Sequence, residues 1–187
     1  MFWQAICDNL GTIIGVLGSI FGVFLGWWLN NITKKGKLLI NIKGGLNGEF
    51  LTKDGFPATS IENSQRFGYK VELEIYNSSE DIKVMKDIQI SFYRKGFDMF
   101  SVTPNDKERE HCVNASIVMH EKVKIINCPA KMATTLSLYG CIKNDDIQKV
   151  YESGSVFLSY KDEFGRKKVK LIEAVDYKNY EFYNGEE

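Results

Sequence analysis

The chain is poor in the residues that catalytic and metal sites use most often. It has two histidines, His111 and His120, and four cysteines among 187 residues. Neither histidine accompanies a Gly-x-Ser-x-Gly motif, and no glycine-rich loop continues into the Lys-Ser/Thr pair of a phosphate-binding loop. The spacing of His111, Cys112, His120 and Cys128 matches no zinc pattern. We therefore expect a protein that is not an enzyme and that needs no cofactor or metal.

The sequence also lacks a disulfide framework and an excess of either charge. Cys7 lies near the N-terminus, and Cys112, Cys128 and Cys141 form an odd set without paired spacing. Reduced thiols are the expected state of such cysteines. The 24 Lys and Arg residues equal the 24 Asp and Glu residues in number, so the net charge indicates no nucleic-acid partner.

Charge is almost missing from the first 33 residues, which contain Asp8 and no Lys or Arg. Residues 10–29 form a run of 20 without an ionisable group, and 13 of them are Leu, Ile, Val, Phe or Trp. At about 1.5 Å per residue this run spans roughly 30 Å, the thickness of the hydrocarbon core of a bilayer. A secretory signal peptide would need a basic start and a small-residue cleavage site, and neither is present. We predict a transmembrane helix over residues 10–29.

The residues flanking this span predict its orientation. Those expected at the membrane interface are Trp3, Trp27, Trp28, Lys34, Lys35 and Lys37. All three lysines follow the span, in a basic juxtamembrane segment over residues 30–37, and none precedes it. The positive-inside rule then places residues 1–9 outside the cell membrane and the C-terminal domain in the cytoplasm. These lysines and Lys43 could also contact anionic lipid headgroups, although topology already accounts for them.

Small residues form a strip along the predicted span. Its members are Gly11, Gly15, Gly18, Ser19, Gly22 and Gly26. The five glycines fall within an arc of about 80° on a helix, and the serine borders that arc. Small side chains let helix backbones approach closely in lipid, so we predict a homo-oligomer or pairing with another small-faced helix. The alternative is that glycine is simply frequent in membrane helices.

From residue 38 onward the apolar pattern has a period of two, which is typical of strands with one buried face. The alternation is clearest over 69–76 and 88–93. Further strands are expected at 38–42, 113–119, 123–127, 134–138, 156–160 and 167–172. About eight short strands predict a mainly β domain over residues 38–187, an antiparallel β-sandwich of the immunoglobulin-like type.

Turn and helix signals complete this prediction. Residues 77–81 have turn chemistry, Gly44-Gly45 is expected to end the first strand, and 105–110 is expected to be a solvated loop, with at most one helical turn. The loop 162–166 has Gly165 late in its sequence, which predicts a hairpin with a left-handed residue there. Residues 145–151 have the apolar spacing of one short helix.

The layout of the chain is characteristic: a span is followed by strands at Tyr69–Asn77 and Ile88–Tyr93 and by a hairpin at Asp162–Arg166. It resembles that of uncharacterised bacterial single-pass membrane proteins with a cytosolic immunoglobulin-like β-sandwich. The resemblance covers the whole layout and implies the fold, but it carries over no functional residue. It also implies a setting, because some such proteins accompany phage-defence or mobile-element genes.

Two charged or aromatic segments are open to more than one interpretation. The basic cluster Arg166, Lys167, Lys168 and Lys170 is expected to be a solvated sheet face, since Phe164 alone is thin support for nucleic-acid stacking. The segment 177–187 holds four aromatic residues among acidic ones. It is either a last edge strand or a partner-binding segment.

Two functions fit these features. The first is a single-pass, membrane-anchored, non-enzymatic binding or scaffolding protein, whose cytoplasmic sandwich binds an unidentified protein partner. The alternative is a membrane-acting effector, whose glycine-faced spans oligomerise to form a pore or disrupt the bilayer. Thr12 and Ser19 are the only hydroxyl side chains in the span, which disfavours a wide water-filled pore.

Overall fold

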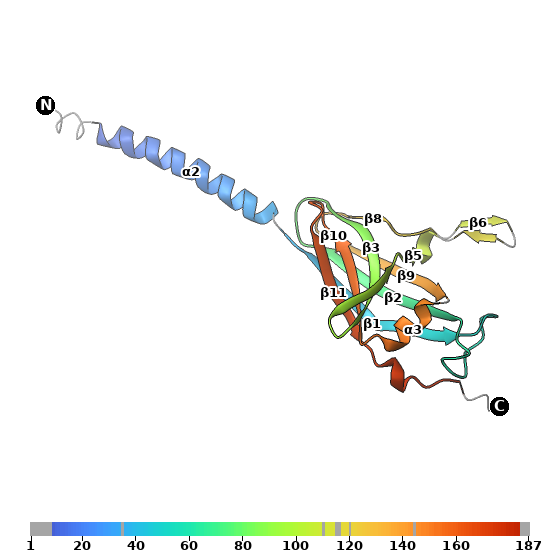
Figure 1. Ribbon diagram of the computed structural model, residues 1–187. Helices are drawn as coiled ribbons and strands as arrows, with labels where there is room; N and C mark the ends of the chain where they lie inside the picture. Colours follow the sequence, from blue (N-terminus) through green and yellow to red (C-terminus); the bar gives the residue numbers. More distant parts are fainter. Residues whose placement is uncertain are drawn as a thin grey trace.

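The computed structural model describes residues 9–34, 36–109, 111–114, 117–119, 121–143 and 145–183. A long N-terminal helix, α2 (Leu10–Lys34), projects away from a compact β domain (Figure 1). Residues 10–32 of this helix are long and apolar enough to cross a membrane. The helix continues beyond residue 29, so most of the predicted juxtamembrane segment is helical. Trp3 and Lys35 lie outside the described residues.

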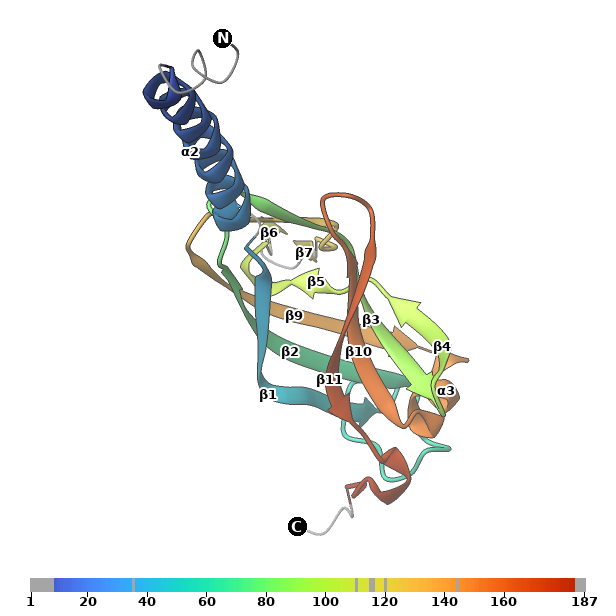
Figure 2. The same ribbon diagram turned by 90° about the vertical axis from the view of Figure 1, so that its left-hand side faces the viewer.

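The first sheet has four antiparallel strands in the order β1-β2-β9-β5 (Figure 2). Their bounds are β1 (Leu38–Leu51), β2 (Arg66–Asn77), β9 (Ala133–Lys143) and β5 (Asn105–Asp106). Strands β1 and β2 run side by side along nearly their whole length, from Leu38 opposite Asn77 to Leu51 opposite Arg66. Strand β2 also pairs with β9 along most of its length, so it is central in this sheet.

The second sheet is also antiparallel, in the order β11-β10-β3-β4, with β8 paired to the start of β3. Its strands are β11 (Lys167–Ala174), β10 (Ser155–Lys161), β3 (Lys83–Arg94), β4 (Phe97–Val102) and β8 (Ile125–Cys128). Taken in chain order, the two sheets have the strand arrangement of an immunoglobulin-like sandwich, with one strand added beside the third. The predicted fold class is therefore confirmed.

The core lies between the inner faces of the two sheets. Alternate residues of β2 and β3, such as Leu73, Ile75, Ile90 and Phe92, are fully buried there. Leu158 of β10 joins them, and burial of each such side chain stabilises the fold by roughly 1.5–3 kcal/mol. Strands β2 and β10 contain no cysteine, so side-chain packing takes the place of the inter-sheet disulfide of antibody domains.

One short helix and the C-terminal segment cover the end of the sandwich distant from α2 (Figure 1). Helix α3 (Asp146–Glu152) buries Ile147 and Val150, as its spacing predicts. The 3-10 turn η2 (Tyr177–Asn179) and the residues after it pack aromatic rings around Phe50. The ring centroids of Tyr177, Tyr180 and Phe182 lie 5.6, 5.0 and 5.6 Å from that of Phe50. This part of the tail is thus a piece of the core, neither an edge strand nor a free segment.

Two local predictions were wrong, and a third differs in part. Gly44 and Gly45 do not end the first strand, because both adopt positive φ (74° and 72°) in a bulge through which β1 continues. Residues 113–119 do not form one strand, since β6 (His111–Asn114) and β7 (Ile117–Met119) pair as a hairpin. Residues 107–109 form the one helical turn allowed for the segment 105–110, the 3-10 turn η1 (Lys107–Arg109), and the difference from the expected loop is the two-residue strand β5 before it.

Candidate functional site

The described apolar side chains of helix α2 are exposed to its surroundings from Leu10 to Ile32, with Leu25 half-exposed. A Cβ atom added to Gly11, Gly15, Gly18, Gly22 or Gly26 would meet no atom within 4 Å outside the helix's own backbone. The glycine strip is therefore an open face. The Ser19 hydroxyl donates a hydrogen bond to the Gly15 carbonyl (2.8 Å), which satisfies this polar group within the helix.

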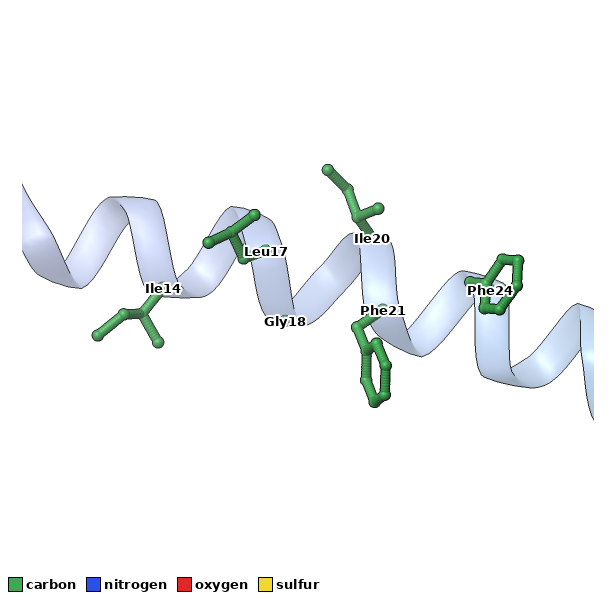
Figure 3. Close-up of a pocket in the computed structure, with 6 residues that line it drawn as sticks. All are labelled: Ile14, Leu17, Gly18, Ile20, Phe21 and Phe24. Carbon is green, nitrogen blue, oxygen red and sulfur yellow. The ribbon is translucent and has the colours of Figure 1, made fainter.

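The large side chains around the strip radiate outward from the helix (Figure 3). Gly18 lies between Ile14 and Phe21 and leaves a shallow notch in the surface. A notch flanked by large apolar side chains is the shape that a second closely packed helix fills in lipid. That a second helix packs into this notch stays a prediction.

The link between α2 and the sandwich is short and fixed to a loop of the domain. The Lys37 backbone N–H donates to the Ser78 hydroxyl (2.8 Å), and the hydroxyl donates back to the Lys37 carbonyl (2.9 Å). The Ser78 N–H also donates to this carbonyl (3.1 Å). A Cβ atom at Gly36 would overlap the backbone of Ser78 and Ser79, so this close approach requires glycine.

A cleft of about 760 Å³ opens beside this link. The last turn of α2 and the link contribute Asn31, Lys34 and Lys37, and the β10–β11 hairpin contributes Phe164 and Arg166. Its other lining residues include Asp81, Lys83, Tyr160, Asp162, Glu163 and Lys168. The end of the predicted span and the tip of the predicted hairpin thus lie together, although 130 positions separate Lys34 from Phe164.

Asp162 organises the tip of the β10–β11 hairpin. Its carboxylate accepts hydrogen bonds from the backbone N–H groups of Phe164 (3.0 Å) and Arg166 (2.9 Å) and from Nε of Arg166 (2.8 Å). Burial raises the pKa of Asp162, but these hydrogen bonds and the Arg166 charge outweigh it, so the pKa lies below its ordinary value. Gly165 has a φ of 77°, which confirms the predicted left-handed position.

Glu163 and Lys83 connect this hairpin to the start of β3. Lys83 Nζ lies 2.6 Å from Glu163 Oε1, and both side chains are partly buried. Desolvation raises the pKa of Glu163, but the hydrogen bond from Lys83 outweighs it and the net shift is downward. The hairpin is therefore held in place by an ion pair as well as by its own strand register.

The outer faces of the two sheets differ in character. On the first sheet, Lys70 pairs with Glu72 (2.7 Å) and Lys43 with Glu74 (3.5 Å), as in a solvated surface. On the second sheet, Tyr93 packs edge-on against Phe157, with ring centroids 4.8 Å apart. Val169 and Leu171 extend this apolar area along β11, where both are exposed. An uncovered apolar sheet face is typical of a protein interaction surface.

The basic cluster of β11 is divided between two faces. Lys168 and Lys170 lie opposite Tyr160 and Leu158, on the side of the sheet that faces the first sheet. Lys167 lies opposite Lys161 on the outer side. A bulge in β11, opposite Val156 and Phe157 of β10, shifts the strand register and so decides which lysines face the first sheet. Nothing in the sequence pattern indicated this bulge.

The groups weighed for catalysis and metal binding are either scattered or outside the described side chains. Within the described residues no group of three or more His, Cys, Asp and Glu lies close enough to hold a metal ion. The side chains of His111 and Cys112, and the whole of His120, fall outside that set. Burial raises the pKa of the Cys128 thiol to about 11, which keeps it protonated and unreactive.

The fold and this geometry define a class of protein: an immunoglobulin-like sandwich fixed closely to an N-terminal helix that is long and apolar enough to cross a membrane. Comparison with known proteins places the sandwich in a family. The YopI Ig-like domain family matches residues 39–173, and the chain belongs to this family.

One relative matches most of the chain. It is 27% identical over 168 residues to the SPbeta prophage-derived uncharacterized protein YopI of Bacillus subtilis (strain 168). The match covers 85% of this chain and 94% of that protein. The immunoglobulin-like part of the expected resemblance is thus confirmed, and its membrane grouping is not addressed by these comparisons.

Proposed function

We propose that this protein is a single-pass protein of the cell membrane whose sandwich binds a protein partner in the cytoplasm. Helix α2 carries the proposal, because nearly all its described apolar side chains are exposed. Exposed apolar surface costs about 25 cal/mol per Å² in water and nothing comparable in lipid. A bilayer is therefore the environment that best fits this helix.

The flanking residues support one orientation. Trp27, Trp28 and Lys34 lie in the last two turns of α2, and Lys35 and Lys37 follow. Basic residues are retained on the cytoplasmic side, and the segment before the helix has none. The sandwich then lies in the cytoplasm, with residues 1–9 on the other side of the membrane.

The outer face of the second sheet is the surface that we propose binds the partner. It presents Tyr93, Phe157, Val169 and Leu171 together, whereas the outer face of the first sheet presents the paired charges of β1 and β2 beside the single apolar pair Leu39 and Tyr76. Aromatic and aliphatic side chains on a rigid sheet supply binding energy at a small cost in conformational entropy. Binding rather than catalysis is proposed because Phe157, Val169 and Leu171 offer no acid, base or nucleophile, and burial raises the pKa of the Tyr93 phenol further above its ordinary value.

The helix supports the role of anchor more than that of pore. Ser19 donates its hydroxyl hydrogen to the Gly15 carbonyl, so it offers little to line a water-filled channel. Association through the glycine strip would instead cluster several sandwiches and raise their avidity for a shared partner. Measurement of inner-membrane leakage on overexpression separates the two functions, since an anchor leaves the membrane intact.

The prophage origin of the relative directs the search for the partner. That protein is described as SPbeta prophage-derived, and it shares most of its length with this chain. We propose that the partner is a phage or host protein that acts at the cytoplasmic surface of the membrane.

Two measurements test the anchoring and its orientation. The full chain should resist extraction by alkaline carbonate. A reporter that functions only in the cytoplasm should be active when fused after Glu187, and a reporter that functions only after export should be inactive there. Release of the protein by carbonate would disprove the anchor. Activity of a reporter that works only after export would reverse the orientation.

A crosslinking pull-down from native membranes tests the binding face. The variant Val169→Glu/Leu171→Glu should lose the partner recovered with the wild type, because it places two charges on the apolar area. The matched control Lys70→Glu/Glu72→Lys, on the polar sheet, should retain it. Equal recovery with both variants would exclude the outer face of the second sheet as the binding surface.

A further inference from the structure

We propose that the end of the sandwich nearest α2 lies against the bilayer and binds anionic lipid headgroups. This headgroup face consists of three loops: 78–82 between β2 and β3, 129–132 between β8 and β9, and 162–166 between β10 and β11. The proposal rests on the proposed membrane anchoring, which carbonate extraction tests separately.

Hydrogen bonds hold two of these loops at the exit of the helix. The backbone and hydroxyl of Ser78 bond to the backbone of Lys37, three residues after α2 ends. The loop 129–132 is tied to the same point, because Lys131 Nζ donates to the Ser78 carbonyl (2.8 Å) and Lys131 N donates to the Ser79 carbonyl (3.2 Å). Both loops therefore stay where the chain leaves the membrane.

The third loop lies beside the last turn of the helix. The cleft between them is lined by Asn31 and Lys34 on one side and by Phe164 and Arg166 on the other. Figures 1 and 2 show the tip of the β10–β11 hairpin at the end of the domain nearest α2, with α3 and the C-terminal segment at the opposite end. The three loops thus form one face that surrounds the helix exit.

Each loop of the headgroup face exposes a large apolar side chain. Ile82 is 66% exposed, Met132 is 56% exposed and Phe164 is 72% exposed. The Arg166 guanidinium lies over the Phe164 ring, 4.8 Å from its centroid. An aromatic ring next to a cation suits the headgroup region, where apolar side chains reach the acyl boundary and cations meet phosphate.

The charge of this face complements an anionic membrane. The basic residues at or next to the three loops are Lys34, Lys37, Lys83, Lys131, Lys161, Arg166, Lys167 and Lys168. The acidic residues there are Glu80, Asp81, Asp162 and Glu163. The last two already pair with Arg166 and Lys83, respectively, and Lys161 pairs with Asp87 of β3 (2.8 Å). The unpaired surplus is basic, and each such cation near an anionic surface strengthens membrane binding.

The length of the link favours lipid over a protein as the occupant. Four Cα steps join Lys34 to Leu38, so the chain can separate the end of the helix from the domain by at most about 14 Å. Much of that distance lies within the headgroup layer, which is roughly 5–8 Å thick. A folded partner or a second sandwich needs more room, whereas lipid headgroups already fill this space.

Photo-crosslinking of the full chain in liposomes tests the proposal. A benzophenone amino acid replaces Phe164 in one variant and Ile82 in a second. In the control it replaces Phe97, which is 78% exposed and follows the β3–β4 turn, at the opposite end of β3 from the headgroup face. The liposomes contain phosphatidylcholine with or without phosphatidylglycerol, and thermal unfolding verifies that each variant is folded.

We expect lipid adducts at positions 164 and 82 in about tenfold excess over position 97. The yield should fall several-fold without phosphatidylglycerol or in high salt, because both changes weaken the attraction to the basic residues. Equal lipid yield at all three positions, or none at 164 and 82 in folded protein, would overturn the proposal. Adducts between two protein chains at position 164 would also overturn it, by showing that a protein occupies this face.

Discussion

At the scale of single residues, Asp162 couples the headgroup face to pH. Three hydrogen bonds and the Arg166 charge lower the pKa of this carboxyl in the folded state. A carboxyl with a lowered pKa stabilises the fold above its unfolded pKa of about 3.9. That contribution is lost as the pH falls through the folded pKa.

Replacement of this carboxyl tests the coupling. We expect Asp162→Asn to lower the Tm at pH 7, because the amide retains an acceptor for the loop N–H groups but loses the charge that faces Arg166. The difference in Tm between the wild type and the variant should shrink as the pH falls below about 4. Thermal unfolding followed by circular dichroism from pH 3 to pH 7 measures both. A difference independent of pH would show that the charge contributes nothing.

Gly36 is a second residue whose role follows from its surroundings. A Cβ atom there would overlap the backbone of Ser78 and Ser79, so Gly36→Ala must displace one of the two segments. We expect a loss of about 1–3 kcal/mol in the free energy of unfolding, the usual cost of overpacking.

Gly154→Ala is the matched control for this substitution. No atom lies within 4 Å of the Cβ position at Gly154, and we expect its effect to stay within about 0.5 kcal/mol. Urea unfolding of the two variants gives the comparison. Equal stability for both would show that the link is not fixed to the loop as described.

At the scale of elements, the glycine strip of α2 is the feature with the most direct test. Gly18→Ile/Gly22→Ile places branched side chains where a second backbone would approach, and we expect helix association to weaken by on the order of 1 kcal/mol or more. Insertion should be unaffected or improved, since isoleucine is more apolar than glycine.

The control for the strip is Leu17→Ile, on another face of the helix. A membrane two-hybrid or crosslinking assay on residues 1–37 compares the three sequences. If wild type, double variant and control associate equally, the glycines reflect composition and the helix is a plain anchor.

A strand could be predicted from the sequence where one of its faces is buried and the other is exposed. Strand β2 was predicted from the sequence because its residues alternate strictly in burial, and β3 because the apolar residues Ile88, Ile90 and Phe92 alternate with polar or half-buried ones. Strand β4 was missed, since its residues are all exposed or half-buried and give no clear period. The second half of β1 was missed because Gly44 and Gly45, usually turn residues, form a bulge inside the strand.

The candidate surfaces show the same limit at longer range. The span and the basic flank were readable from the sequence, because each is a local run of one residue type. The juxtaposition of Lys34, Ser78 and Phe164 was not, since it depends on how the end of α2 and two loops distant in the sequence meet at one end of the sandwich. The packing of Phe182 against Phe50 was hidden for the same reason.

At the scale of the whole molecule, the anchor and the sandwich should be separable. The buried side chains of the core all come from residues 50–177, and the apolar part of α2 buries none of its surface against the domain. Its removal therefore takes away exposed apolar area without opening a cavity in the core.

We expect residues 37–187 to be soluble, monomeric and rich in strands when expressed without the helix. Lys37 is retained in this fragment because its backbone bonds to Ser78 and holds the loop 78–82. Circular dichroism should show a strand-dominated spectrum, and thermal unfolding should be cooperative, as in other single domains of this size. A spectrum dominated by helix would contradict the sandwich. An insoluble or non-cooperative fragment would show that the domain needs its anchor in order to fold.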